Sequence, residues 1–137
     1  MLECSNGAYY TGYTKDILRR YREHRRGTQN CRYTRVWPPV RIAQCWRVYD
    51  SRGTAIKIEG LIKRHSRKVK VALVEHPEGL SSMIADKLHL DVTVCPFDPA
   101  RVEEALADSA QGAGNGDPFA DMPPDGNAGV AICTGRR

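Results

Sequence analysis

Five side chains between residues 10 and 59 are of types and at separations that suit acid–base or charge-binding chemistry: Tyr10, Tyr13, Arg20, His24 and Glu59. Arg20 and His24 are four residues apart in a predicted helix and therefore share a face. Both tyrosines lie in the predicted strand that precedes this helix. Glu59 borders the apolar stripe of another predicted helix, where a buried carboxylate needs a counter-charge or a metal ion. These types at these separations predict a site rather than an ordinary polar surface.

Each of these residues also has a purely structural interpretation. Asp16 and Arg20 fit an ion pair one helical turn apart, worth roughly 0.3–0.5 kcal/mol. His24 fits a last-turn residue that the helix dipole favours, and Glu59 fits an ion pair with Lys63. Taken singly, the structural interpretation is the stronger one for each residue, whereas the combination favours a site.

The first elements that must position these residues form a hairpin followed by a helix. Asn6-Gly7 predicts a type I′ turn, which needs two positive φ angles, and a β-prone strand over 8–13 follows it. Thr14 is the predicted cap of a helix that runs to about Arg26 and stops at Gly27. Only residues 1–4 are left to pair with the six-residue strand, so the first strand looks cut short.

One strand and two helices complete this part. A strand over 40–49 is predicted to place Val40, Ile42, Trp46 and Val48 on one side. Thr54 is the predicted cap of a helix with a buried stripe, formed by Ala55, Ile58, Leu61 and Ile62. A short helix begins at Ser66, with Val69, Ala72 and Leu73 facing inward, and ends at His76-Pro77. The predicted fold is a small α+β domain with a three-stranded antiparallel sheet flanked by helices.

The chain is expected to divide into three parts: a domain over 1–77, an extension over 78–110 and a tail over 111–137. Alternating apolar residues predict a strand over 88–94 in the extension. Asp98-Pro99 predicts the start of a helix whose apolar face includes Val102 and Leu106. Six of the twelve glycines and three prolines fall in the tail, which is predicted to be disordered.

Charge is distributed very unevenly along the chain. Residues 15–70 carry 17 lysines and arginines against four acids, a balance of +13, whereas residues 71–137 have a balance of −7. A +13 segment is expected to bind the phosphate backbone of a polyanion in a salt-dependent way. A merely soluble basic surface is the alternative. A further alternative is that the acidic segment folds over the basic one or binds a protein partner.

Two features bear on the compartment. The sequence has no apolar run near the roughly 20 residues that cross a bilayer and no pattern of a secretory signal. Its five cysteines form no CxxC pair, which favours reduced thiols in a cytoplasmic protein.

The order and spacing of several short motifs resemble the small bacterial stand-alone members of the GIY-YIG nuclease superfamily. The motifs read LECSNG from Leu2, YTGYT from Tyr10, D-x-x-x-R-x-x-x-H from Asp16, YTR from Tyr33 and E-x-x-x-K-R-x-S-R from Glu59. The resemblance covers residues 2 to about 76. It implies a metal-assisted phosphodiesterase that acts on DNA, and a role in DNA repair is what the family as a whole suggests.

The resemblance also implies a role for each matching residue. Tyr10 corresponds to the general base for the attacking water, although a free phenol has a pKa near 10. Arg20 corresponds to the arginine that contacts the scissile phosphate, and His24 to a histidine that supports the tyrosine or relays its proton. Glu59 corresponds to the sole carboxylate that holds one Mg²⁺ or Mn²⁺ ion. The basic side chains expected to hold the DNA backbone are Arg19, Arg22, Arg26, Arg35, Lys63, Arg64, Arg67 and Lys68.

One departure from the family pattern keeps two functions open. The GIY half of the signature belongs about eleven residues before Tyr10, a position that precedes Met1. A start placed too late and a true truncation both explain this. The first favours an active endonuclease. The second favours a nucleic-acid-binding module with impaired catalysis, because positioning errors of about 1 Å cost on the order of 100-fold in rate.

Overall fold

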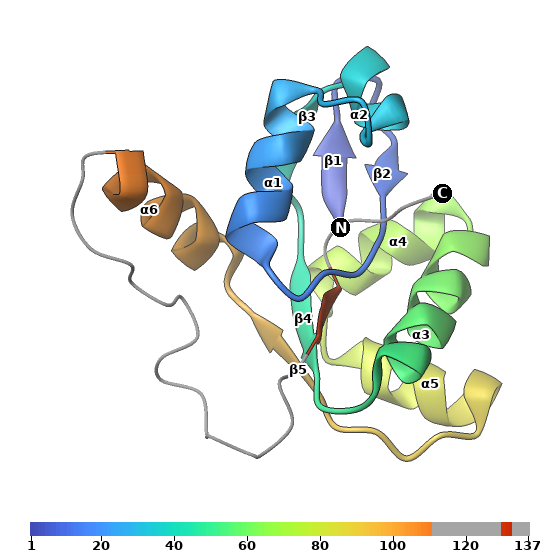
Figure 1. The fold of residues 1–137 in the computed structure, drawn as a ribbon. Helices are drawn as coiled ribbons and strands as arrows, with labels where there is room; N and C mark the ends of the chain where they lie inside the picture. Colours follow the sequence, from blue (N-terminus) through green and yellow to red (C-terminus); the bar gives the residue numbers. More distant parts are fainter. Residues whose placement is uncertain (111–129, 133–137) are drawn as a thin grey trace.

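The computed structural model describes residues 1–110 and 130–132, which form six helices and six strands (Figure 1). The strands are β1 (Leu2–Cys4), β2 (Tyr9–Tyr10), β3 (Pro39–Ile42), β4 (Cys45–Val48), β5 (Val94–Phe97) and β6 (Val130–Ile132). The helices are α1 (Ile17–Arg26), α2 (Arg32–Val36), α3 (Arg52–Arg64), α4 (Arg67–Glu75), α5 (Gly79–Leu88) and α6 (Pro99–Ala110).

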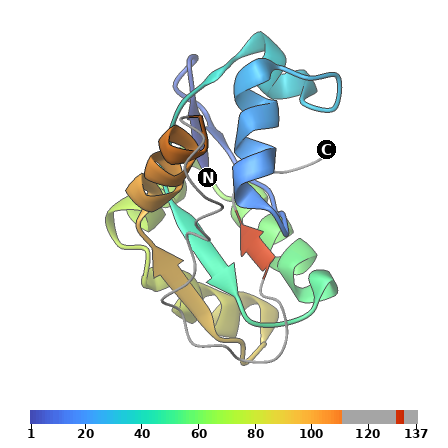
Figure 2. The same cartoon turned by 60° about the vertical axis from the view of Figure 1, so that its left-hand side comes forward.

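The predicted α+β class with a three-stranded antiparallel sheet is confirmed. The first sheet has the order β2-β1-β3, and Leu2 of the central strand lies opposite both Tyr10 and Ile42. A second antiparallel sheet has the order β5-β4-β6 (Figure 2). In Figure 1, α1 and α6 lie together on one flank, while α3, α4 and α5 cover the other.

The single strand predicted over 40–49 is wrong, because the chain changes sheet in the middle of it. The backbone N–H groups of Ala43 and Gln44 both donate to the carbonyl of Met1, at 2.9 and 3.4 Å. This contact ends β3, and β4 begins at Cys45 in the second sheet. Ile42, Trp46 and Val48 are buried as predicted, whereas Val40 is exposed on an edge strand.

Two apolar clusters form the core, and both contain residues from the predicted extension. The first gathers Trp46, Ile58 and Ile62 with Leu80 and Ile84 of α5. The second gathers Leu2, Ile17 and Tyr21 with Phe97 and Val102. The predicted stripe of α3 is confirmed, since Ala55, Ile58, Leu61 and Ile62 are all buried. In α4, Leu73 is buried as predicted, but Ala72 is exposed.

The helix boundaries depart from the predictions by about one turn or less. Asp16, not Thr14, caps α1, and its Oδ1 accepts a hydrogen bond from the Arg19 amide at 2.9 Å. Ser51, not Thr54, caps α3, and its Oγ accepts from the Thr54 amide at 3.2 Å. Gly27 ends α1 in the left-handed region, as predicted, with φ of 66°.

Several local predictions are wrong for reasons of tertiary context. Asn6-Gly7 is not a type I′ turn, because only Gly7 has a positive φ; the Asn6 side chain instead accepts from the Ala8 amide at 3.1 Å. Helices α2 and α5 were not predicted. The strand expected over 88–94 begins only at Val94, where pairing with Val48 starts.

The predicted disorder of the tail is wrong at residues 130–132, which pair with β4. The rest of that prediction, residues 111–129 and 133–137, lies outside the described residues. Cys4, Cys31 and Cys95 are free thiols as expected, whereas Cys45 is disulfide-bonded. Within the described part of the chain, no helix is both long and apolar enough to span a membrane.

Candidate active site

Tyr10 lies at the centre of the candidate site, between two other rings. Its ring stacks on Tyr33, with centroids 5.6 Å apart and planes 9° apart. The His24 imidazole lies on it at a tilt, with a centroid distance of 5.2 Å. The short strand β2 fixes Tyr10 through its pairing with Leu2 of the central strand. The structure therefore brings together Tyr10 and His24, two of the predicted site residues.

The surroundings of Tyr10 keep its phenol protonated. Burial raises its pKa to about 12, and the negative charge of Glu59 contributes to the rise. The Arg20 guanidinium acts in the opposite direction and lowers the same pKa. At neutral pH the phenolate fraction is on the order of one molecule in 100,000. Tyr10 therefore cannot act as a preformed phenolate and has to lose its proton during the reaction.

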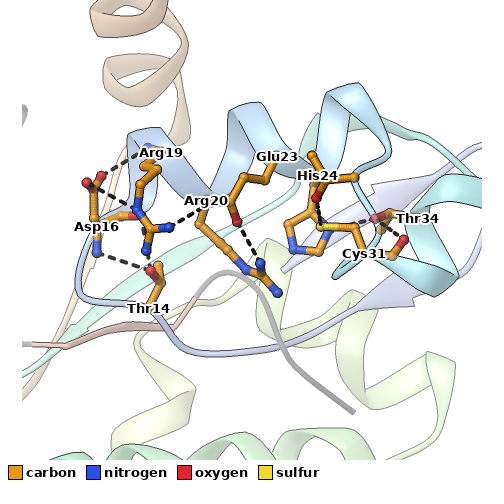
Figure 3. A network of polar contacts seen from close by, with 9 residues as sticks. Thr14, Asp16, Arg19, Arg20, Glu23, His24, Cys31 and Thr34 are labelled. Atoms are coloured by element: carbon orange, nitrogen blue, oxygen red, sulfur yellow. Dashed lines mark hydrogen bonds and ion pairs between the residues drawn. The ribbon is translucent and has the colours of Figure 1, made fainter.

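His24 is fully buried near the end of α1, and one of its two nitrogens is fixed by a hydrogen bond. Nδ1 lies 2.6 Å from the Thr34 hydroxyl, which in turn donates to the carbonyl of Cys31 at 3.3 Å (Figure 3). Nε2 is buried and has no hydrogen-bond partner among the described residues. Burial, together with the charge of Arg20, lowers the pKa of His24 to about 4. The imidazole is therefore neutral at physiological pH.

Arg20 is held in place by an acidic neighbour on its own helix. Its Nη1 donates to Glu23 at 2.7 Å, and the other oxygen of the same carboxylate accepts from Arg19 at 2.7 Å. Hydrogen bonding from Arg20 lowers the pKa of Glu23, so the carboxylate stays ionised. The predicted Asp16–Arg20 pair is wrong, because Asp16 contacts Arg19 instead. Arg20 is mostly buried, and Figure 3 shows its guanidinium beside the His24 ring.

Glu59 is a buried carboxylate on α3, far from α1 in sequence. It forms the ion pair with Lys63 that the structural interpretation anticipated. Its charge also acts on Tyr10, as the Arg20 charge does. Charged groups of both α1 and α3 thus influence the pKa of one phenol.

Glu59 is also the residue that the resemblance assigns to a divalent cation. Its carboxylate is buried and forms an ion pair with the ammonium of Lys63. Among the described residues, no three His, Cys, Asp or Glu side chains gather as a metal cluster. One carboxylate fits an ion such as Mg²⁺, which keeps several waters and takes substrate phosphate oxygens as further ligands. Such an ion would have to compete with Lys63 for Glu59.

The predicted DNA-contacting side chains lie mainly on α1, α3 and α4. Arg19, Arg26, Arg35, Lys63, Arg64, Arg67 and Lys68 are exposed, and Arg22 is half-buried. Arg67 is fixed: its Nε donates to the Gly7 carbonyl at 3.1 Å, and its guanidinium lies 5.4 Å from the centroid of the Tyr9 ring. Seven of these eight basic side chains are exposed and therefore accessible to a polyanion.

Three residues of the site were not assigned a role from the sequence: Thr34, Tyr33 and Glu23. The YTR motif contains two of them, but their function depends on α2 folding back onto β2 and α1. The spacing of Glu23, three residues after Arg20, was the one available signal, because residues three apart are neighbours on a helix. The contacts of Thr34 and Tyr33 join segments that are distant in sequence, and no spacing pattern in the sequence predicts them.

Comparison with known proteins agrees with this geometry. The model of the GIY-YIG catalytic domain matches residues 1–72. A UPF0213 protein of Listeria monocytogenes is 40% identical over 79 residues, covering 57% of this chain and 86% of its own. A UPF0213 protein of Xanthomonas campestris is 41% identical over 75 residues, covering 55% and 72%. One from Halobacterium salinarum is 44% identical over 73 residues, covering 53% and 92%.

No solved structure matches the chain. The names of the relatives specify no activity, whereas the matching domain implies a function of the nuclease type and a DNA substrate. GIY-YIG nucleases generally use divalent metal ions. The match covers more than half of the chain, and the protein belongs to the GIY-YIG family.

Proposed function

We propose that this protein is a metal-dependent endonuclease that hydrolyses phosphodiester bonds in DNA. The observation that carries the proposal is the environment of Tyr10: its ring contacts His24, and the charges of Arg20 and Glu59 both act on its phenol. A phenol, a neutral imidazole, a guanidinium and a carboxylate are the groups needed to bind a phosphate and move a proton.

Arg20 is the group that binds the scissile phosphate. Its guanidinium is already oriented by Glu23 at 2.7 Å, so little side-chain entropy is lost when the substrate binds. Charge that develops on the phosphate oxygens is stabilised most strongly by a preorganised donor in a partly buried setting. Arg20 therefore contributes more to the transition state than to ground-state binding.

Tyr10 and His24 together accept the proton of the attacking water. As the water attacks phosphorus, its proton passes to the phenol oxygen, and the phenol's own proton passes to His24 Nε2. Nε2 has no hydrogen-bond partner in the described part of the unbound protein, so the Tyr10 hydroxyl has to move onto it when the substrate binds. This relay avoids a free phenolate, which a pKa of about 12 disfavours. The negative phosphate raises the basicity of His24 when DNA is bound. After cleavage the proton returns by the same route through Tyr10, because Nε2 itself is buried.

Thr34 sets the tautomer on which this relay depends. Because the Thr34 hydroxyl gives its hydrogen to the Cys31 carbonyl, its oxygen accepts the Nδ1 hydrogen of His24. The second nitrogen, Nε2, then carries a lone pair instead of a hydrogen. Thr34 is a positioning residue in this account.

Glu59 is the residue that would hold the divalent ion, which supplies Lewis-acid stabilisation of the phosphate when bound. With the ion bound, Lys63 would release Glu59 and could contact a DNA phosphate. This exchange keeps the buried carboxylate neutralised both before and after the ion binds.

The test is cleavage of supercoiled and linear DNA with Mg²⁺ or Mn²⁺. Wild-type protein should nick DNA, a chelator should stop it, and Tyr10→Phe and Glu59→Gln should each abolish it. Glu75→Gln is the matched control, since it removes one exposed carboxylate from the neighbouring helix α4. Equal cleavage by wild type and Glu59→Gln would identify a contaminant and refute the proposal.

A second candidate is a nucleic-acid-binding module that does not cleave. The Lys63–Glu59 ion pair favours it, because the carboxylate that would hold the ion is already neutralised. This candidate predicts salt-sensitive DNA binding that persists in chelator, with no nicking at any Mg²⁺ concentration.

A further inference from the structure

Exposed apolar side chains gather in one short stretch of the described chain. Tyr33, Val36, Trp37 and Val40 belong to it, with Val36 63% and Val40 62% exposed. We call these four residues the 33–40 surface. A single exposed apolar residue is ordinary, whereas a contiguous group indicates an interaction site.

The 33–40 surface begins at the candidate active site. Tyr33 stacks on Tyr10, and its hydroxyl accepts a hydrogen bond from Asn6 at 2.9 Å. The Trp37 amide donates to the Tyr33 carbonyl at 3.0 Å, so the two aromatic residues are joined by one helical turn. Residues four apart lie on the same side of such a turn. The surface therefore extends outward from Tyr10.

The chain segment that carries the 33–40 surface is positively charged, and the nearby Glu3 carboxylate of β1 is paired with Arg41. Residues 24–49 contain no aspartate or glutamate, and Arg32 and Arg35 are exposed within them. A second copy of the chain docked through this surface would bring like charges together. A nucleic acid fits both properties, because its phosphates complement arginines and its bases stack on aromatic rings.

We infer that the 33–40 surface binds an unpaired base of the substrate, stacked on Trp37, with the adjoining phosphates on Arg32 and Arg35. The inference rests on the proposed action on DNA. The base has to be unpaired because the faces of bases inside a duplex are covered by their neighbours. The substrate class is thus DNA with a single-stranded segment next to the cleaved bond.

Intrinsic fluorescence tests this inference without any cleavage. The chain has two tryptophans: Trp46 is fully buried, with its indole N–H donated to the Pro77 carbonyl at 2.8 Å, whereas Trp37 is 44% exposed. Oligothymidylate added in chelator should quench the fluorescence, and duplex DNA of equal length should quench it much less. Equal quenching by both would overturn the inference.

Affinity measurements on variants complete the test. Trp37→Ala should weaken binding of oligothymidylate by about 10- to 100-fold and binding of duplex by less than about twofold. Ile56→Ala is the matched control, because Ile56 is 45% exposed on α3 and should have no effect. Unchanged oligothymidylate affinity in Trp37→Ala overturns the inference, as does a dimer in sedimentation that Trp37→Ala dissociates. If the protein shows these effects but cannot nick DNA, the nuclease proposal is refuted and the inference about the 33–40 surface stands.

Discussion

Replacing Thr34 by valine removes the hydroxyl that fixes the His24 tautomer and keeps the side chain's size. The Nδ1 hydrogen loses a partner at 2.6 Å in a fully buried position. A buried donor without a partner costs about 1–3 kcal/mol. Moving the hydrogen to Nε2 does not avoid this cost, because Nε2 is also buried without a partner among the described residues. Thr34→Val therefore removes the preference for the tautomer that leaves Nε2 free.

The expected loss follows from that energy. In wild type, a bias of about 1–3 kcal/mol keeps nearly all His24 with an unprotonated Nε2. In Thr34→Val the two tautomers become about equally populated, so this fraction falls by about twofold. The single-turnover cleavage rate of Thr34→Val should fall by the same factor. Binding of DNA in chelator should stay within about twofold, because Thr34 is buried and does not reach the substrate.

Nitrogen-15 NMR of the imidazole provides a readout that does not depend on activity. Wild type should show hydrogen on Nδ1, Thr34→Val should show a mixture of the two tautomers, and Thr34→Ser should restore both the tautomer and most of the rate. A Thr34→Val protein that cleaves as fast as wild type, or that keeps the hydrogen on Nδ1, contradicts this reasoning.

Three further outcomes are expected. Gly60→Ala should raise the free energy of unfolding by about 1 kcal/mol in urea denaturation. Gly60 lies inside α3, and a Cβ there would meet nothing closer than Arg64 Nη1 at 3.9 Å. A lower free energy of unfolding would show that position 60 has no room for a methyl group. His24 has a pKa of about 4 in the folded protein against an ordinary 6.5, so the unfolded chain gains a proton first as pH falls. Its stabilisation should be complete above pH 6.5 and lost towards pH 4, about 3 kcal/mol in all, and His24→Gln should remove this part of the pH dependence. Arg64→Ala should reduce the slope of log Kd against log salt by about 1 for DNA binding, whereas Lys87→Ala on α5 should leave it unchanged.

The sequence predicted those features of the fold that local patterns determine. The stripe of α3 follows from apolar residues three and four positions apart, and Gly27 ends α1 because only glycine adopts a positive φ at little cost. The order of the hairpin, α1, the following strand and α3 also follows from such patterns. Each of these features depends on residues within one or two turns.

The missed features depend on contacts between segments. The chain leaves the first sheet at Ala43 because two amides meet the Met1 carbonyl, a contact across more than forty residues. Helix α5 is stabilised by burying Leu80 and Ile84 against Trp46 and Ile58, which no local pattern reveals. The alternation of apolar residues over 88–94 therefore did not predict the strand correctly, because packing between segments determines where it begins.

The candidate site shows the same division. Tyr10, Arg20, His24 and Glu59 were predicted from residue type and spacing, and the structure brings Tyr10 and His24 into contact. Thr34 was not assigned a role, because its function exists only where α2 packs against α1. Pairings across 10 residues or more need the tertiary structure.

The most direct test of the central claim is a double-variant cycle on single-turnover DNA cleavage with Tyr10→Phe and Glu59→Gln. Groups that act as one unit on the same phosphodiester are strongly non-additive. The account predicts that the double variant is no slower than the slower single variant. Losses that multiply across the two positions would show that Tyr10 and Glu59 act independently, and would contradict a shared site.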